Sequence, residues 1–388
     1  MSEAATVERR FITPFNVIAA LILATGAVVL FIRFTQGLSA TTNLNHDFPW
    51  GLWIGFDVMS GVALAAGGFT ISTAVYLFGM KEYRAIVRPA LLTAFLGYAL
   101  VVVGLLADLG RPWRLPYAFV VQSGPTSALF EVALCVGLYL TTLFIESLPP
   151  AFEWLGFKRM RRIIHSSVVA LTIFGLMLST MHQSSLGGLF TIAPTRLHPL
   201  WYSPHIPVHF FVSAIGAGIS MLIVESMISH RVFRDQVELT HKQFDNITIG
   251  LAKAGAIVFA IYFGIRVAGL ALEDDWHYLG TGYGALYLVE MIGFVLLPVL
   301  LFSIGYRERR PGLVRATGVL AVLGIVFNRL NVCFIAYNWE LPAGQRYVPH
   351  WMEIAVTLAL ITAGVVAFRW IANHMPIMYE HPDYKGGH

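Results

Sequence analysis

The chain has 388 residues, of which 57% are hydrophobic and only 12% are charged. A soluble domain carries roughly 25% charged residues, so this composition excludes a soluble globular protein and predicts an all-α integral membrane protein. The net charge of +4 requires no nucleic-acid partner, because membrane topology accounts for the positions of the basic residues.

A helix needs about 20 apolar residues to cross roughly 30 Å of hydrocarbon. Ten segments meet this requirement: 12–32, 52–78, 89–109, 127–147, 163–181, 206–229, 247–270, 285–304, 313–335 and 351–373. The first follows Arg9 and Arg10 and has no clear small-residue cleavage site, so we interpret it as a retained helix rather than a signal peptide.

Residues 1–388 are therefore expected to form a single polytopic membrane domain. Within it, the second to fifth spans (about 52–181) and the sixth to ninth (about 206–335) suggest two four-helix bundles, flanked by helices 12–32 and 351–373. Sixteen Lys and Arg residues lie in the N-terminal segment and in every second loop, whereas five lie in the alternate loops. This asymmetry predicts that both termini are cytoplasmic.

Charged residues occur inside these apolar segments, mostly near the outer face. Asp57, Glu131, Arg266, Glu290 and Arg329 interrupt five spans; Asp108 and His182 close the third and fifth, and Glu353 opens the tenth. A charge at membrane depth costs a few kcal/mol or more, and it is usually kept because it pairs, lines a wet cavity or moves protons. Each of these residues is therefore a candidate for function.

The two halves differ in the balance of these charges. Arg266, Glu290 and Arg329 can neutralise one another as a structural ion-pair network, although a functional role stays open. In the first half Asp57, Asp108 and Glu131 have only Arg111 and His182 as nearby candidate counter-charges. An excess of carboxylates in an apolar setting favours proton exchange with a bound ligand. The first half is therefore the better candidate for a functional site.

The end of the fifth span carries several polar groups together. His182, Gln183 and Ser184 offer an imidazole, an amide and a hydroxyl, and the paired glycines Gly187 and Gly188 are expected to break the helix after them. Such a group can bind a carbonyl oxygen or transfer a proton.

Two charged residues, Glu225 and Lys253, belong to the inner half of the membrane. They either form an ion pair or begin a proton route toward the outer charges.

Several cofactors are not expected. The two cysteines, Cys135 and Cys333, are too few for an iron–sulfur cluster, which needs about four thiolates. None of the thirteen histidines lies near the middle of a span, so a membrane b-type haem is not expected either. No metal site is predicted.

Several strings of residues are specific enough to indicate a family. The segment Phe-Pro-Trp-Gly-Leu-Trp-Ile-Gly-Phe-Asp at 48–57, followed by Gly61 and Gly67-Gly68, resembles the NrfD/PsrC membrane subunits of the polysulfide-reductase type. Within that family, four strings are most similar to the HybB-type subunits of hydrogenase-2: 87–92, 108–111, 181–185 and 198–201.

The resemblance implies a haem-free, quinone-reactive subunit in the bacterial cytoplasmic membrane. An iron–sulfur partner, of a nickel–iron hydrogenase in the HybB type, would dock at the outer, periplasmic face and exchange electrons with menaquinone or ubiquinone. The family keeps its quinone pocket in the first bundle. Here the pocket would comprise Asp57, Glu131 and His182 as catalytic residues, with Asp108, Arg111, Gln183, Ser184 and His198 beside them.

In this hypothesis His182 donates to or accepts from a quinone oxygen, Asp57 or Glu131 exchanges protons with the quinone, and Arg111 stabilises the anion formed by electron uptake. A second hypothesis adds proton translocation. The main alternative is a secondary transporter or an ion or proton channel with a buried charged site. Co-purification with an iron–sulfur protein and bound quinone would separate the two, because a transporter would purify alone.

Overall fold

The computed structural model describes residues 13–121, 123–237 and 239–381, and Arg9 and Arg10 lie outside them. Within this part of the chain, ten helical segments are long and apolar enough to cross a membrane. The predicted all-α membrane fold and all ten spans are confirmed, since each observed segment overlaps one predicted from the sequence.

The spans are α1 (Pro14–Gln36); an irregular helix, Trp53–Leu77, that includes α2 (Gly61–Leu64) and α3 (Gly67–Ser72); α4 (Val87–Asp108); α6 (Ala128–Ser147), followed by α7 (Pro149–Leu155); α8 (Lys158–Gly188); α9 (Ile206–Val232); α10 (His241–Leu272); α11 (Gly282–Leu288) continuing into α12 (Leu297–Arg307); α13 (Pro311–Leu330), extended to Ile335; and α14 (Trp351–His374). A short helix, α5 (Tyr117–Val120), lies in the loop before α6.

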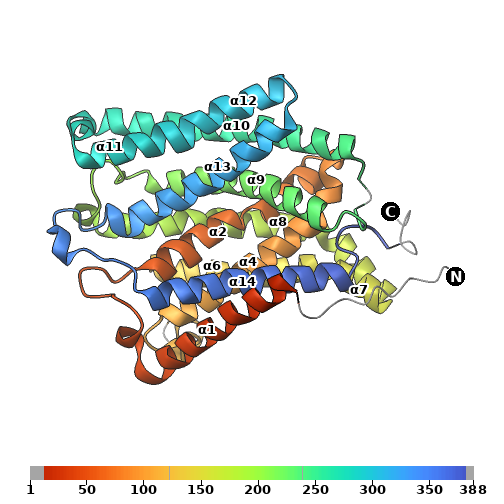
Figure 1. The fold of residues 1–388 in the computed structure, drawn as a ribbon, viewed down its shortest axis with the longest axis horizontal. Helices are drawn as coiled ribbons and strands as arrows, with labels where there is room; N and C mark the ends of the chain where they lie inside the picture. The colour runs from red at the N-terminus through yellow and green to blue at the C-terminus, as the bar shows by residue number, and fades with distance from the viewer. Residues whose placement is uncertain (1–12, 122, 238, 382–388) are drawn as a thin grey trace.

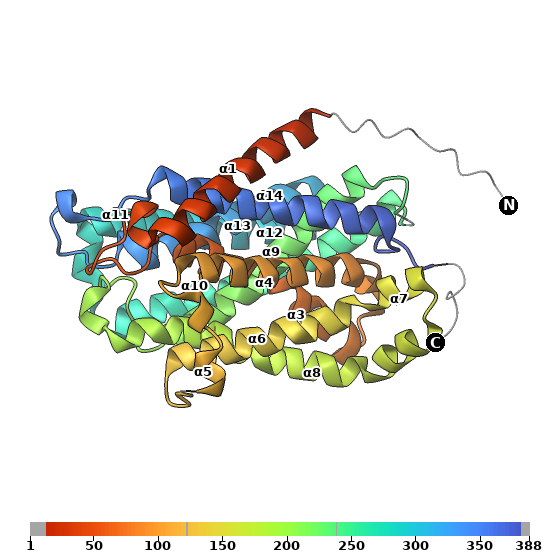
Figure 2. The ribbon, with the colours of Figure 1, turned by 90° about the horizontal axis from the view of Figure 1, so that it is seen from below.

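The long helices lie side by side, with α10 and α12 along one edge and α1 and α14 along the other (Figure 1). Helices α9 and α13 pack between them, and α6 and α8 lie on the face opposite α1 and α14 (Figure 2). We call the end that carries the loops 37–52, 109–127, 193–205, 273–281 and 336–350 the outer end, after the predicted orientation. The opposite end is the inner end. The division into two bundles stays a prediction.

The second span is the most buried of the ten and lies at the centre of the molecule. Its glycines allow close contact with neighbouring helices: a Cβ atom on Gly67 would lie 3.1 Å from the carbonyl oxygen of Gly218 on α9, and one on Gly68 only 2.5 Å from Cβ of Ala94 on α4. Small residues permit such close approach of helix backbones. This packing fixes the depth and orientation of the polar residues that the span carries.

Several of the buried polar residues lie in π-helical segments. Asp57 belongs to the segment Trp53–Ser60, Glu290 to Val289–Leu296 and Asn331 to Asn331–Ile335. A π-turn adds a residue to the helical repeat and is frequently found at functional sites.

The fifth span differs from the sequence-based expectation. The α-helix runs seven residues past the predicted end at 181 and ends at the paired glycines, with Gly188 as its last residue, after which a 3-10 turn (Leu189–Ile192) continues the span. A Cβ atom on Gly187 would lie 2.7 Å from the carbonyl oxygen of Ile206, so this glycine serves the close contact between α8 and the start of α9. As a result His182 lies inside the helix and is completely buried, rather than at its end.

Candidate functional site

The buried imidazole of His182 lies between three helices. Its Nε2 atom is 2.6 Å from the hydroxyl oxygen of Tyr98 on α4, and its Nδ1 atom is 2.7 Å from the carbonyl oxygen of Leu178 one turn earlier on α8. The ring of Tyr139 on α6 packs against both, with its centroid 5.5 Å from that of His182 and 4.7 Å from that of Tyr98. We call His182, Tyr98 and Tyr139 the imidazole cluster.

These contacts determine the tautomer of His182. A carbonyl oxygen only accepts hydrogen bonds, so Nδ1 must carry a proton and donate it to Leu178. In the neutral ring Nε2 is then the acceptor, and the Tyr98 hydroxyl donates to it. Next to it, the Gln183 side chain donates to the carbonyl oxygen of Val62 in the second span, at 3.0 Å. His182 can thus accept a proton at Nε2 only from the Tyr98 hydroxyl, or from a group that takes the place of that hydroxyl.

A second cluster lies where the second span and α4 meet the two flanking helices. The carboxylate of Asp57 is buried and accepts a hydrogen bond of 2.8 Å from the hydroxyl of Thr357 on α14. Gly104 on α4 makes room for it, since a Cβ atom there would lie 3.0 Å from Cβ of Asp57. No cation forms an ion pair with Asp57 in the part of the chain that the structure describes.

Two more carboxylates, Asp108 and Glu353, belong to this second region. Asp108 ends α4, and its Oδ1 atom is buried without a hydrogen-bond partner among the described residues. Glu353 accepts hydrogen bonds from the backbone N–H groups of Asn43 and His350, and from the hydroxyl of Tyr347. Because burial surrounds it with apolar atoms and Glu353 lies beside it, the pKa of Tyr347 lies above its ordinary value. Tyr347 therefore stays neutral and donates.

One arginine, Arg33 at the end of α1, neutralises part of this acidic region. Its guanidinium donates to the carbonyl oxygens of Ala107, at 2.6 Å, and Leu109 at the end of α4, and so lies beside Asp108. We call Asp57, Asp108, Glu353 and Arg33 the carboxylate cluster. It holds three acids and one cation. Asp57 and Asp108 belong to the predicted first-half set, whereas Glu353 comes from α14 and Arg33 from α1, and no hydrogen bond or ion pair between the described residues joins Glu131 to them.

The sequence-predicted catalytic set is not brought together by direct contacts. Asp57 bonds to α14, whereas His182 bonds to α4, and no hydrogen bond or ion pair joins either to Glu131 within the described ranges. Glu131 lies in the first turn of α6 and is only partly buried. Arg111 is exposed in the loop after α4, and Ser184 is partly buried on α8. Their roles stay predictions.

His198 lies in an aromatic cage at the outer end. The loop that carries it pairs with the loop after the ninth span, through a hydrogen bond of 2.9 Å from its backbone N–H to the carbonyl oxygen of Ala336. Its ring is enclosed by four aromatic side chains, whose centroids lie 4.6–5.7 Å away: Trp201, Tyr278, Tyr283 and Trp339. Burial lowers the pKa of His198 to about 4. Its ring thus packs with residues of the second half.

The charges of the second half form a connected network. Arg266 pairs with Glu290 at 3.8 Å, as expected from the sequence. Glu290 also accepts from Trp201 at 2.8 Å and from the side-chain amides of Asn328 and Asn331, each at 2.7 Å. Arg329 reaches this carboxylate only through Asn328, to which it donates at 2.7 Å. We call Arg266, Glu290 and Arg329, with these partners, the arginine network.

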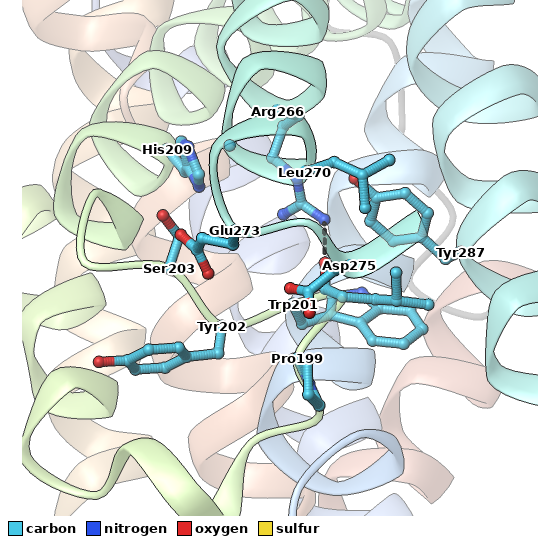
Figure 3. Close-up of a pocket in the computed structure, with 12 residues that line it drawn as sticks. Pro199, Trp201, Tyr202, Ser203, His209, Arg266, Leu270, Glu273, Asp275 and Tyr287 are labelled. Atoms are coloured by element: carbon cyan, nitrogen blue, oxygen red, sulfur yellow. Dashed lines mark hydrogen bonds between the residues drawn. The ribbon is translucent and has the colours of Figure 1, made fainter. Parts of the chain in front are cut away.

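A small cavity lies beside Arg266 at the outer end of this network (Figure 3). Its lining includes His209, Ser203 and Glu273, and Arg266 donates across it to the carbonyl oxygen of Leu200 at 3.4 Å. The cavity measures about 10 Å³. That is room for about one water molecule, and not for an organic ring.

The inner residues Glu225 and Lys253 do not form the ion pair considered from the sequence. Glu225 is buried and accepts a hydrogen bond of 2.6 Å from the hydroxyl of Ser229, one turn later on α9. The ammonium group of Lys253 instead lies 5.9 Å from the ring centroid of Tyr306. The two helices, α9 and α10, present these side chains to different neighbours, so the charges do not meet.

Sequence reasoning missed several residues that the fold brings into these clusters. They are Tyr98, Tyr139, Arg33, Tyr347 and Thr357. Arg33 gave a signal, because it is a cation at the end of an apolar span. Neutral hydroxyls such as Tyr98 and Thr357 gave none, since tyrosine and threonine inside membrane helices mostly serve packing.

Comparisons with known proteins agree with this architecture. A sequence model of the family "Polysulphide reductase, NrfD" matches residues 40–339. A protein of Nitratidesulfovibrio vulgaris is 53% identical over 385 residues, 99% of each chain. The probable Ni/Fe-hydrogenase 2 b-type cytochrome subunit of Escherichia coli is 29% identical and covers 89% of this chain and 88% of its own. The integral membrane subunit of N. vulgaris menaquinone reductase is 26% identical, over 92% and 90%.

Proposed function

Because the chain belongs to the NrfD polysulphide reductase family of multi-pass membrane subunits of respiratory oxidoreductases, we propose that it is the quinone-reactive subunit of such a complex. It would exchange electrons between an iron–sulfur partner at the outer face and a membrane quinone, menaquinone or ubiquinone. The similarity to a menaquinone reductase subunit and to a hydrogenase subunit supports this class of reaction. A nickel–iron hydrogenase is the partner complex that we propose first.

The observation that carries the proposal is the pairing of buried acids and hydroxyls in the first half. Reduction of a quinone to a quinol consumes two electrons and two protons, so the pocket must supply protons as well as bind two oxygens. Asp57 is a buried carboxylate held by a hydroxyl rather than a cation, and His182 is a neutral imidazole held by Tyr98. Groups of this kind can change protonation state during turnover without breaking an ion pair.

In the arginine network the carboxylate already has partners. Glu290 accepts three hydrogen bonds and pairs with Arg266, and the adjoining cavity of about 10 Å³ is too small for a quinone ring. We therefore propose the second half as scaffold and the first half as the quinone site.

The name of the E. coli relative includes a b-type cytochrome. The two buried histidines of the candidate site, His182 and His198, do not fit axial ligation of a haem. Both ring nitrogens of His182 are engaged, by Tyr98 and Leu178, and His198 accepts a hydrogen bond from the backbone N–H of Leu200 inside its aromatic cage. Among the residues that the structure describes, no cluster of three or more potential metal ligands is found. We derive no step through haem.

We further propose that the chain lies in the bacterial cytoplasmic membrane with both termini on the cytoplasmic side. The charge asymmetry of the loops supports this orientation, and it directs the carboxylate cluster toward the periplasm. Purification through a tag on this chain tests the partner: an iron–sulfur protein and bound quinone should accompany it. A chain that purifies alone, with no iron and no quinone, would contradict the proposal and favour a transporter.

Substitution of the first-half residues tests the site. In the purified complex, Asp57→Asn or His182→Ala should lower quinone-linked turnover about a hundredfold or more, since each removes a proton-exchanging group. Reduction of a soluble dye by the partner should not change. Asp47→Asn, at an exposed acid of the same outer end, is the matched control. Normal quinone reduction by both site variants would remove these residues from the mechanism.

A further inference from the structure

A large cavity opens at the inner end of the first half. It measures about 470 Å³ and lies between α4, α6, α7, α8 and the segment that follows α14. Its rim is charged: Arg88 and Arg161 both bind Glu153, at 2.7 Å each, and Arg161 also pairs with Glu380 at 3.2 Å. A cavity with this many ionic groups holds water, so water can reach the membrane-embedded ends of these helices.

One acid of this cavity has no cation beside it. Glu146, near the end of α6, lines the cavity and is 7% exposed. Its carboxylate accepts a hydrogen bond of 3.3 Å from the hydroxyl of Thr172 on α8. Within the described ranges no Lys, Arg or His forms an ion pair with it, in contrast to Glu153 on the same rim. Ionisable residues kept at membrane depth without a charge partner are typical of proton relays.

Polar side chains continue from Glu146 toward the outer end along the contact between α6 and α8. On α6 they are Thr142 and Tyr139, four and seven residues before Glu146; on α8 they are Ser179 and His182, seven and ten residues after Thr172. These spacings put each set on one face of its helix. At 1.5 Å per residue, the α8 set covers roughly 15 Å along the membrane normal. All of these side chains are buried.

Two hydroxyls in this stripe lack hydrogen-bond partners. Tyr139 Oη and Ser179 Oγ are buried and close to one another, yet neither makes a hydrogen bond of ordinary geometry among the described residues. Buried polar atoms in this situation are the usual binding sites of ordered water. Tyr98, which donates to His182, also lies beside Ser179. Hydroxyls and bound water together can pass protons along the stripe.

We infer that the inner-end cavity, Glu146 and the hydroxyl stripe form the path by which protons travel between the inner side of the membrane and the imidazole cluster. Glu146 takes a proton from cavity water and passes it, through Tyr139 and Ser179, to Tyr98 and His182. Two electrons from the partner and two protons from the inner side then convert one quinone to one quinol; quinol oxidation releases the same protons inward. The inference rests on the proposed quinone site.

This path replaces the route through Glu225 and Lys253 that the sequence suggested. Glu225 is also a buried inner glutamate bonded to a hydroxyl, but it lies on α9 and does not line the inner-end cavity. The two acids therefore make a matched pair for experiment. The same Glu→Gln change is made at similar burial, but only Glu146 lines the cavity.

The test uses the intact complex in proteoliposomes with a pH-sensitive dye on each side. A reduced viologen donates electrons to the partner, and a short-chain naphthoquinone accepts them. In the wild type about two protons should leave the inner-end compartment per quinone reduced. Glu146→Gln should lower quinone reduction about a hundredfold, Glu146→Asp should restore much of it, and Glu225→Gln should behave as the wild type. Glu308→Gln, at an exposed inner-loop acid, is the control.

The outcomes separate the path from the quinone site. If Glu146→Gln reduces quinone and takes up inner protons at wild-type rates, the path is overturned. Proton uptake by the wild type from the outer compartment alone would overturn it as well. In either case quinone reduction itself continues, so the proposed quinone site is not contradicted. Loss of activity in Glu225→Gln but not in Glu146→Gln would assign the route to α9. If the wild-type complex reduces dye but never quinone, the proposed function itself fails. A thermal unfolding midpoint for each variant excludes misfolding, and Glu146→Asp keeps the test valid if Glu146→Gln does not fold.

Discussion

The two halves of the molecule hold buried carboxylates in different ways. In the second half Glu290 pairs with Arg266 and accepts three further hydrogen bonds. In the first half Asp57 and Glu146 each accept one hydrogen bond, from a threonine, and among the described residues neither forms an ion pair. A carboxylate held by an ion pair and three hydrogen bonds resists any change in protonation, whereas a carboxylate bound only by a hydroxyl can gain or lose a proton at small cost to its surroundings. The arrangement of partners, more than the presence of a charge, separates scaffold from chemistry.

The largest expected effect comes from breaking the arginine network. Glu290→Gln keeps the side-chain shape but leaves Arg266 as a buried cation without its acid partner. Removing one partner of a buried ion pair typically costs about 3–5 kcal/mol. The variant should therefore show a markedly lower thermal unfolding midpoint in detergent, whereas Asp57→Asn should unfold close to the wild type. Equal unfolding midpoints for Glu290→Gln and Asp57→Asn would contradict the proposed difference between the two halves.

A medium effect is expected in the imidazole cluster. Tyr98→Phe keeps the aromatic packing but removes the hydroxyl that donates to Nε2 of His182. A buried acceptor left without its donor costs about 1–3 kcal/mol, so the unfolding midpoint should fall by less than in Glu290→Gln. Quinone-linked turnover should fall as well if Tyr98 passes protons. Tyr283→Phe, which removes only a long contact of 3.4 Å to the carbonyl oxygen of Trp339, serves as the control.

The smallest effect concerns pH and the aromatic cage. The pKa of His198 is about 4, below the ordinary value near 6.5, so between these limits the unfolded chain binds a proton that the folded chain does not. This contribution to stability is present above about pH 6.5 and is lost as pH falls toward 4. His198→Phe should therefore lose less stability than the wild type between pH 7 and pH 5. If the unfolding midpoints of the wild type and His198→Phe change with pH in the same way, His198 does not contribute to the pH dependence of stability.

Much of the fold could be predicted from the sequence. All ten spans follow from apolar length, even where a single charge interrupts the run, because hydrocarbon requires every backbone polar group to be bonded within a helix. The end of the fifth span was placed too early: the apolar run stops at 181, but α8 continues to the paired glycines and ends at Gly188. The missing side chain of Gly187 lets this last turn of α8 approach the start of α9, a contact that composition alone does not indicate.

The candidate site was predictable only in part. Asp57, Asp108, His182 and Glu290 stand out in the sequence because a charge in an apolar run is costly, whatever the fold. Their partners do not stand out. Thr357 lies 300 residues from Asp57 and Arg33 reaches the end of α4 across 74 residues, so only the packing of α1 and α14 against α4 brings them together.

The sequence by itself determined that this protein spans the membrane ten times, which segments do so, and which charged residues need an explanation. These follow from the free energy of transferring each segment into hydrocarbon, a property of local composition. Only the tertiary structure decided which charges form ion pairs, that His182 is a buried acceptor, and that Glu146 lines the inner-end cavity. Those properties depend on which helix faces pack against one another. A π-turn or a single glycine contact changes that packing without changing the composition of the segment.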